Sequence, residues 1–144
     1  GMNHEITPEL RSMVEADPFA ASLGAKLLEI KPGRARFGLR LRGEHLNFMG
    51  MVHGGVIFSL ADFAFAAASN SFGNKAVALS VAIDFLAAAE PGDELTAEVR
   101  QESRAGRMGY YSMVVTDAAG RMIASCRGWA YHTGKPHGDA WRGG

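Results

Sequence analysis

The chain has 144 residues, of which 47% are apolar and 21% charged, a composition typical of one folded domain and unlike a disordered chain. Its formal net charge is zero, which argues against a nucleic-acid partner because such partners require a basic surface. A single cysteine excludes an intramolecular disulfide framework and favours a cytoplasmic location. No apolar run reaches the roughly 18 residues of a membrane span, and the polar N-terminus does not resemble a signal peptide.

The first 20 residues are predicted to form a helical segment. Thr7 is a suitable N-cap, Pro8 suits the first helical position, and Gly24 is expected to end the segment. The pattern then changes to strands. Residues 26–30 form a short apolar run, and the strict alternation over residues 34–41 predicts a half-buried antiparallel strand. Its inward face is expected to consist of Ala35, Phe37, Leu39 and Leu41.

Residues 56–70 are apolar on almost every side. A helix without a polar side is buried on every side, so we expect a central helix with a sheet around it. Four more strands are predicted, over residues 76–86, 94–102, 110–116 and 121–132. The order predicts a single α+β domain over residues 1–144, in which an antiparallel sheet wraps around a long central helix. Because one sheet leaves exposed edges, we expect a homo-oligomer; residues 133–144 are predicted to be a mobile tail.

Asp62 is the only ionisable side chain between Gly54 and Asn74. A carboxylate in so apolar a helix needs either a hydrogen-bonding partner or a function, because burying it unpaired costs several kcal/mol. A structural aspartate bonded to a neighbouring strand is one interpretation, and a catalytic group is the other.

His53-Gly54-Gly55 begins the same helix. Two glycines let the backbone approach a ligand closely. The first N–H groups of a helix have no intrahelical acceptor and lie at its positive end, which is the chemistry of an oxyanion site. A simple loop-to-helix turn explains the glycines equally well, and His53 alone is typical of a capping or packing residue.

Helix geometry relates the two features. Gly55 and Asp62 are seven residues apart, so they share a face but are separated by about 10 Å along the axis. One carbonyl carbon cannot contact both groups of the same helix. If they cooperate, two antiparallel helices related by a two-fold axis must each supply one group, which creates two equivalent sites at a dimer interface.

The pattern Asn-x-x-Gly-x-x-His-Gly-Gly over residues 47–55, followed by Leu60-Ala61-Asp62, resembles the hotdog-fold acyl-CoA thioesterases of the phenylacetate-degradation, PaaI-like type. Residues 83–86 with the turn 91–93, and residues 124–128, are similar to further blocks of that family. The resemblance extends over roughly residues 20–132. It implies a hotdog fold and an enzyme that hydrolyses an acyl-CoA thioester to a free acid and coenzyme A, without a metal or other cofactor.

The resemblance also implies the roles of individual residues. Asp62 would be the catalytic carboxylate, as a nucleophile or as a general base on water. The Gly54 N–H would polarise the thioester carbonyl, with Gly55 beside it at the substrate. His53 and Asn47 would orient the loop and the thioester. Many relatives carry a serine or threonine that holds water at a position occupied here by Ala78, and Ser80, expected on the same strand face, is a possible substitute.

The rest of the substrate requires cations for the phosphates of coenzyme A and an apolar pocket for the acyl group. Arg104, Arg107 and Arg127 are candidates for the phosphates, although solvated surface charge is the more common role of such a residue. Phe48, Met49 and Met51 are candidates for the acyl pocket or else core residues. The acyl group and the choice between dimer and tetramer stay open.

Two other functions fit part of this pattern. A hotdog hydratase or dehydratase needs an acid and a base facing one C–C pair, and only Asp62 is available. An acyl-CoA-binding module without turnover would not need both Asp62 and the glycine turn. The five histidines are scattered, and no pair has the helical spacing of metal ligands.

Overall fold

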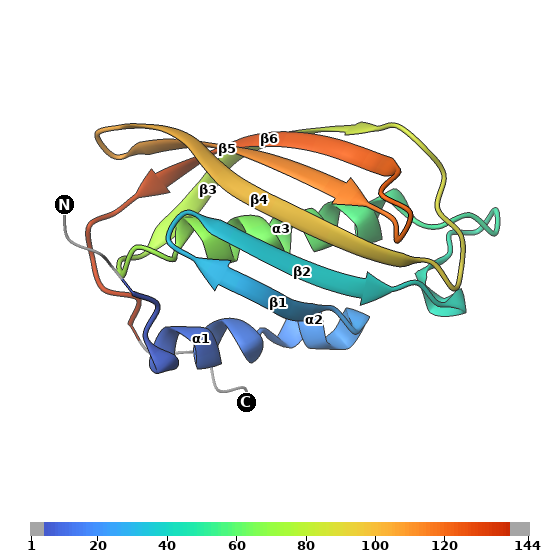
Figure 1. The fold of residues 1–144 in the computed structure, drawn as a ribbon, viewed down its shortest axis with the longest axis horizontal. Coiled ribbons are helices and arrows are strands. Elements are labelled where there is room, and N and C mark those ends of the chain that lie inside the picture. The colour runs from blue at the N-terminus through green and yellow to red at the C-terminus, as the bar shows by residue number, and fades with distance from the viewer. Residues whose placement is uncertain (1–4, 139–144) are drawn as a thin grey trace.

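The computed structural model describes residues 5–138. Two short helices, α1 (Pro8–Glu15) and α2 (Pro18–Leu23), precede a sheet of six antiparallel strands and a long helix, α3 (Gly54–Ser69). The sheet curves over α3, and α1 and α2 lie below β1 (Figure 1). The predicted α+β fold, with one antiparallel sheet around a central helix, is confirmed.

The strands follow the predicted order: β1 (Lys26–Lys31), β2 (Arg34–Arg40), β3 (Ala76–Phe85), β4 (Glu94–Ala105), β5 (Met108–Thr116) and β6 (Met122–His132). Their order in the sheet is β1-β2-β4-β5-β6-β3. The strands that flank α3 in sequence, β2 and β3, are therefore separated by the β4–β6 meander, and β1 and β3 form the two edges. β3 presents exposed apolar side chains along its edge, including Val77, Leu79 and Phe85.

Local signals explain the N-terminal helices. The Thr7 side chain accepts a hydrogen bond from Leu10 N–H at 3.1 Å, and Asp17 caps α2 by accepting from Ala20 N–H at 3.0 Å. Gly24 ends α2 in the left-handed conformation, with φ of 82°, which glycine adopts without a steric penalty. The predicted N-cap at Thr7 and the predicted end at Gly24 are thus confirmed.

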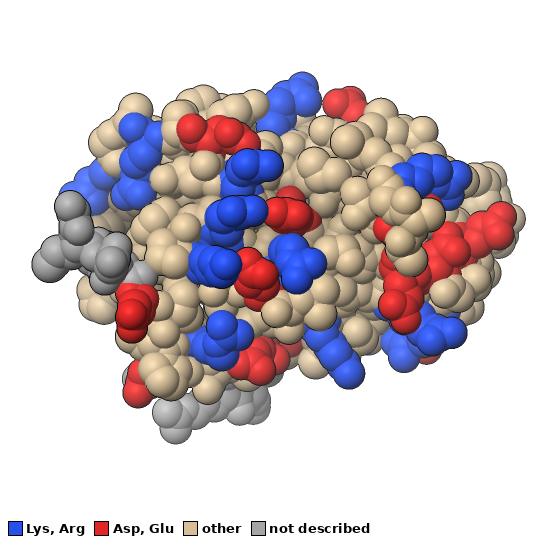
Figure 2. All heavy atoms as spheres, viewed as in Figure 1, with Lys and Arg blue, Asp and Glu red and all other residues tan. Residues whose placement is uncertain are grey.

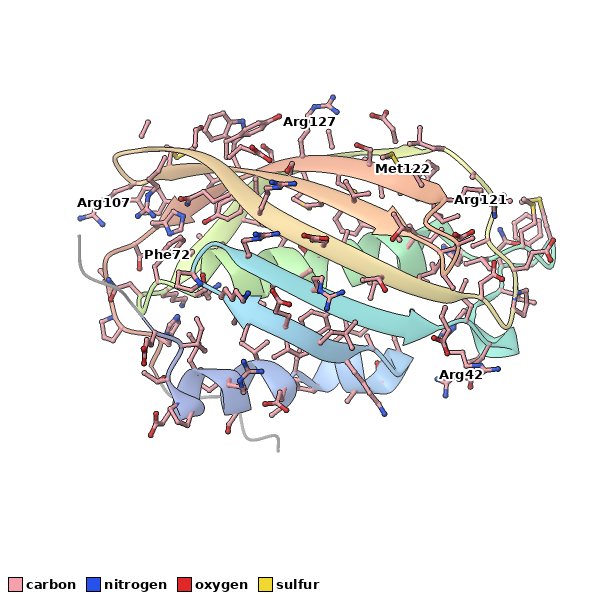
Figure 3. All side chains as sticks on the ribbon, viewed as in Figure 1. Arg42, Phe72, Arg107, Arg121, Met122 and Arg127 are labelled. Carbon is pink, nitrogen blue, oxygen red and sulfur yellow. The ribbon has the colours of Figure 1, made fainter. Side chains whose placement is uncertain are left out.

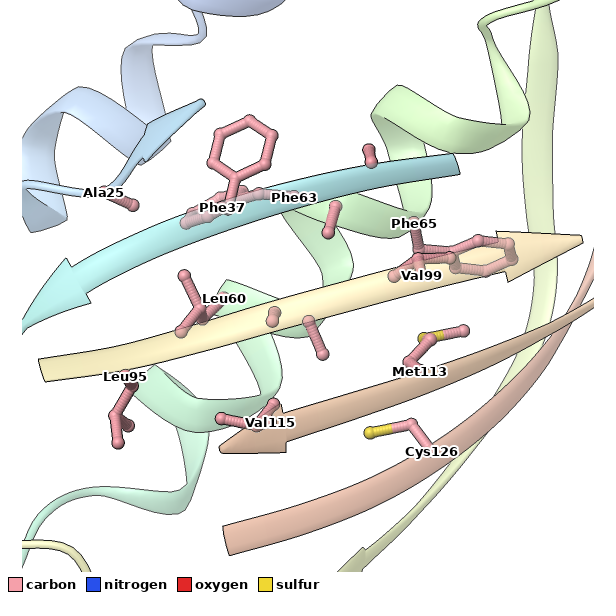
Figure 4. Packing of buried hydrophobic residues seen from close by; sticks show 14 of the residues in the cluster. Ala25, Phe37, Leu60, Phe63, Phe65, Leu95, Val99, Met113, Val115 and Cys126 are labelled. Carbon is pink, nitrogen blue, oxygen red and sulfur yellow. The ribbon is translucent and has the colours of Figure 1, made fainter. Parts of the chain in front are cut away.

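The core lies between α3 and the concave face of the sheet (Figure 4). The alternating side chains of β2 point into it as predicted, and Leu60, Ala64 and Ala68 of α3 have no exposed surface. On the opposite face over β1, β2 and β4, basic and acidic side chains alternate (Figure 2), as in the Arg34–Glu98 pair at 3.0 Å. This mixed surface agrees with the neutral net charge.

Burial of α3 on every side, however, is wrong for the single chain. A stripe along the helix stays accessible: Gly55 and Ala66 are exposed, and Ser59 and Asp62 are half-buried. These residues recur at spacings of three and four, so they form one face. The sheet covers the other sides of α3, and this stripe is the side that one curved sheet leaves open.

The segment after β6 begins with ordered contacts. Thr133 donates its N–H to Lys75 O at 2.9 Å, and Lys75 N–H donates to Lys135 O at 2.8 Å. The predicted mobile tail, residues 133–144, therefore starts with residues held against the loop before β3, and residues 139–144 lie outside the described residues. Within residues 5–138, no helix is long and apolar enough to cross a membrane.

Candidate active site

The site starts at the loop that enters α3. Asn47 Oδ1 accepts hydrogen bonds from Met49 N–H at 2.9 Å and Met51 N–H at 3.1 Å. The Asn47 N–H in turn donates to Met51 O at 2.7 Å. The loop between residues 47 and 51 is therefore closed on itself by Asn47. These contacts fix the shape of the loop, and the role expected for Asn47 in orienting the thioester stays a prediction.

His53 is the N-cap of α3. Its Nδ1 accepts a hydrogen bond from Gly55 N–H at 2.9 Å, so the proton of the neutral ring is on Nε2. This bond occupies the Gly55 N–H but not that of Gly54, for which no acceptor is present within residues 5–138. Gly54 thus offers a free donor at the positive end of a 16-residue helix.

His45 supports this turn, a role that the sequence did not suggest. It is buried, its Nδ1 accepts from Arg42 N–H at 3.0 Å, and its Nε2 donates to Leu23 O at 3.0 Å. The His45 carbonyl accepts from His53 N–H at 2.8 Å. His45 therefore links the end of α2 to the residue that caps α3. The only available signal was a histidine eight positions before His53, which is too weak to interpret.

Asp62 lies on the accessible stripe of α3, two turns after the glycines. No hydrogen-bond or ion-pair partner for its carboxylate is found in the described part of the chain. Burial raises the pKa of Asp62, and the negative charge of Asp17 raises it further. A structural aspartate would have a partner, so the absence of one favours the functional interpretation. The proximity of Asp17 was missed because it depends on how α2 packs on α3.

The Phe85 side chain lies over the start of the helix. A Cβ added to Gly54 would come 3.2 Å from Phe85 Cζ, and one added to Gly55 would come 3.1 Å from His53 Nδ1. Phe85 is 54% exposed. Because its ring lies this close to Gly54, it forms an accessible wall beside the free Gly54 N–H. The glycine pair therefore leaves room for a phenyl ring and an imidazole rather than for an unusual backbone conformation.

The expectation that Ser80 shares a face with Ala78 is wrong. A bulge between Ala78 and Ser80 inserts Leu79, so Ala78 pairs with the inward Ala130 while Ser80 pairs with the outward Trp129. One extra residue moves every following side chain to the other face. Ser80 therefore points away from α3, and Ala78 has no hydroxyl to offer.

The predicted phosphate-binding arginines lie away from the glycine turn. Arg107 and Phe72 are at one end of the molecule, and Arg42, beside the loop that leads to α3, is at the other (Figure 3). Arg104 Nε donates to Gly106 O at 2.9 Å, and Arg107 donates to Thr133 O at 2.6 Å. Within one chain, these guanidinium groups support the β4–β5 turn. Arg127 lies 3.5 Å from the Asp84 carboxylate.

Phe48, Met49 and Met51 project from the loop and are 96%, 62% and 54% exposed. They are not core residues of this chain. In the part of the chain that the structure describes, no cluster of three or more His, Cys, Asp or Glu side chains is placed to hold a metal ion.

Comparison with known proteins identifies the family. The thioesterase superfamily matches residues 49–124, which include the glycine turn, Asp62 and β3 to β5. The chain belongs to the thioesterase superfamily. The resemblance drawn from the motif around Asn47 and Asp62 is confirmed, and the fold is the hotdog fold.

Individual relatives agree with this assignment. The acyl-coenzyme A thioesterase PaaI of Escherichia coli is 34% identical over 92% of this chain and 95% of that protein. The structure of E. coli PaaI, from the phenylacetic acid degradation operon, superposes with a TM-score of 0.83 over 87% of this chain and 91% of that one. A putative esterase of Archaeoglobus fulgidus is 40% identical over 83% of this chain and 77% of that protein.

A Streptococcus mutans protein, solved with bound acetyl CoA, is 26% identical. It superposes with a TM-score of 0.73 over 78% of this chain and 90% of that one.

Proposed function

We propose that this PaaI-like thioesterase hydrolyses acyl-CoA at two equivalent sites of a homodimer, each built from Asp62 of one subunit and the Gly54 turn of the other. The observation that carries the proposal is a pair of groups on α3 that have no partner within residues 5–138: the Asp62 carboxylate and the Gly54 N–H. Acyl transfer needs such a pair, because a base or nucleophile must attack while a donor stabilises the oxyanion.

The helix supports a site shared between two subunits. Seven residues separate Gly55 from Asp62, which is about 10 Å at 1.5 Å per residue, too far for both to contact one carbonyl. The stripe from Gly55 to Ala66 is accessible in the single chain, and the neighbouring edge strand β3 exposes Val77, Leu79 and Phe85. A second copy that pairs along β3 would cover this edge and bring the two α3 stripes together.

In this site the Gly54 N–H of one subunit would hold the thioester oxygen. The carboxylate of Asp62 from the other subunit would attack the carbonyl carbon or deprotonate a water that attacks it. The inner face of β3 carries Ala78 rather than a hydroxyl, and Ser80 points outward, so β3 does not supply the water-holding side chain. Direct attack by the Asp62 carboxylate is therefore favoured: coenzyme A leaves as the thiolate, and water then hydrolyses the acyl anhydride.

A complementation experiment tests the shared site. Asp62→Asn and Gly54→Pro are each prepared as inactive variants, then refolded together. Proline suits the first position of a helix and removes the N–H group. A mixed dimer contains one site with both groups mutated and one with both intact. A random one-to-one mixture should therefore recover about a quarter of wild-type turnover, if the sites are independent.

The substrates for this assay are a panel of aromatic and aliphatic acyl-CoA thioesters, with release of free thiol as the readout. Mass spectrometry of the mixture, with one variant isotopically labelled, verifies that mixed dimers form. Mixed dimers as inactive as their parents would show that the site lies within one chain. Acyl-CoA binding without thiol release by the wild type would instead favour a binding module.

A further inference from the structure

A cavity of about 460 Å³ lies between the N-terminal helices and the second half of α3. We call it the N-terminal cavity; its walls include Leu10 and Met13 of α1, Pro18 of α2, and Phe63, Ala66 and Ala67 of α3. The lining is mainly hydrocarbon. A dry cavity of about 150 Å³ holds one benzene molecule, so this cavity has room for a group larger than a single aromatic ring.

Two of the polar side chains in the lining are already bonded to the protein backbone. The Asn70 amide donates to Ala66 O at 2.9 Å and Ala76 O at 3.1 Å, and its Oδ1 accepts from Ala76 N–H at 2.9 Å. Asp17 caps α2. Lys75 and His137 complete the polar lining. The walls nearest α3 therefore favour an apolar occupant.

The cavity adjoins the proposed catalytic carboxylate. Two residues of its wall follow Asp62 on α3. Phe63 is the next residue, and Ala66 lies one helical turn after Asp62 and is exposed. Asp17, also in the wall, lies close enough for its charge to affect the pKa of Asp62. A thioester carbonyl at Asp62 would therefore have its acyl side next to the mouth of the cavity.

The shared site also brings a second subunit to that mouth. Suppose that two antiparallel helices pair Asp62 with Gly55 of the partner subunit. Residues after Asp62 on one helix then lie beside residues before Gly55 on the other. Ala66, four residues after Asp62, then lies beyond the first residue of the partner subunit's α3, on the side of the loop that enters that helix. Phe48, Met49 and Met51 are the exposed apolar residues of this loop, which Asn47 holds in shape.

On the basis of the proposed function, we infer that the acyl group of the substrate occupies the N-terminal cavity of the subunit that supplies Asp62, and that Phe48 and Met51 of the partner subunit close its mouth. The site would thus select apolar acyl groups of medium chain length, or ring-containing groups of similar size, over acetyl. Residues from α1 and α2 would be specificity determinants, and two subunits would form the acyl pocket as well as the catalytic pair.

Ala66→Leu tests the cavity by filling its mouth, and Ala21→Leu on the exposed side of α2, outside the cavity, is the matched control. One methylene more or less in an apolar pocket changes kcat/KM by about 10–200-fold. Ala66→Leu should therefore lower the ratio of kcat/KM for octanoyl-CoA to kcat/KM for acetyl-CoA at least about tenfold. Ala21→Leu should leave both values unchanged. An equal fall for both substrates, or no change, would overturn the inference.

Mixed dimers then locate the two parts of the pocket. The chain with Gly54→Pro supplies the Asp62 of the only intact site, and the chain with Asp62→Asn supplies its turn and loop. Ala66→Leu should alter acyl preference only on the Gly54→Pro chain, and Met51→Ala only on the Asp62→Asn chain. The reverse dependence, or none, contradicts the arrangement.

These outcomes separate the inference from the function on which it rests. Hydrolysis of acyl-CoA by the wild type with an unchanged preference in Ala66→Leu rejects the cavity alone. Absence of hydrolysis for every thioester of the panel rejects both.

Discussion

Two polar centres of this protein differ in how their hydrogen bonds are satisfied. In the sheet, Gln101 Nε2 donates to the Tyr111 hydroxyl at 2.9 Å, and that hydroxyl lies 3.0 Å from His132 Nε2. Tyr111 is fully buried and His132 nearly so. On α3, by contrast, the Asp62 carboxylate and the Gly54 N–H have no partner within residues 5–138.

The two centres differ in what their polar groups contribute to the protein. A buried polar group with partners contributes to stability, and one without partners lowers it. Burial lowers the pKa of His132 to about 4 and raises that of Tyr111 to about 12, so both stay neutral and bonded near pH 7. A shifted pKa alone would have marked both centres as functional; the missing partners distinguish Asp62 and Gly54 from Tyr111 and His132.

The sharpest test of this difference is Asp62→Asn. The substitution keeps the size of the side chain but removes the carboxylate, so kcat should fall by about 10²–10⁴-fold. Thiol release from the best substrate of the panel measures this. Near-wild-type turnover would remove Asp62 from the mechanism.

The same variant has a predicted effect on stability. Because the pKa of Asp62 is raised in the folded state, the folded protein loses stability as the pH rises through that pKa. Asp62→Asn should therefore have a higher Tm than the wild type at pH 7, with a difference that disappears below the ordinary carboxyl pKa of 3.8. A lower Tm at pH 7 would indicate a structural aspartate.

Gly54→Pro and Gly54→Ala together test the N–H group at the start of α3. Both add a Cβ near the half-exposed ring of Phe85, but only proline removes the N–H. The residue before it, His53, already has φ of −67° and ψ of 130°, a conformation that accepts a following proline. Loss of one oxyanion donor should lower kcat about 10²–10³-fold in the proline variant, with a much smaller change in the alanine variant. Equal losses in both would assign the effect to the side chain.

Tyr111→Phe tests the polar centre in the sheet, where Gln101, Tyr111 and His132 are hydrogen-bonded to one another. It leaves the ring in place and removes the hydroxyl that joins Gln101 to His132, so both groups lose a partner in the interior. We expect about 1–3 kcal/mol less stability by urea denaturation, with kcat unchanged. A large fall in kcat without a loss of stability would mean that this centre takes part in catalysis.

The smallest effect is expected for Asp17, the N-cap of α2, whose charge acts on Asp62. Asp17→Asn removes the charge that raises the pKa of Asp62 but keeps a residue that caps helices well. The acid limb of the kcat/KM profile should therefore move to lower pH, while Tm stays nearly constant. Asp17→Ala is the comparison variant, since it loses the cap as well. An unchanged limb in Asp17→Asn would show that Asp17 does not influence the catalytic group.

The sequence by itself determined the local features of this protein. The caps at Thr7 and Asp17, the end of α2 at Gly24 and the inward face of β2 depend on residues close together in the chain, and each could be predicted from them. The motif from Asn47 to Gly55, with Asp62 after it, was also enough to identify the thioesterase family. Such features depend on φ/ψ preferences and side-chain periodicity, which leave a direct trace in the order of residues.

Only the tertiary structure decided the face of Ser80, the contact of Asp17 with the surroundings of Asp62, and the accessible stripe on α3. A single bulge at Leu79 turns Ser80 outward, because the side-chain period of a strand is two and one inserted residue reverses it. Whether a carboxylate has a partner depends on segments 40 or more residues apart that meet only after the sheet has curved over α3. Such contacts are set by the packing of whole elements against one another, and that packing has no local signature in the sequence.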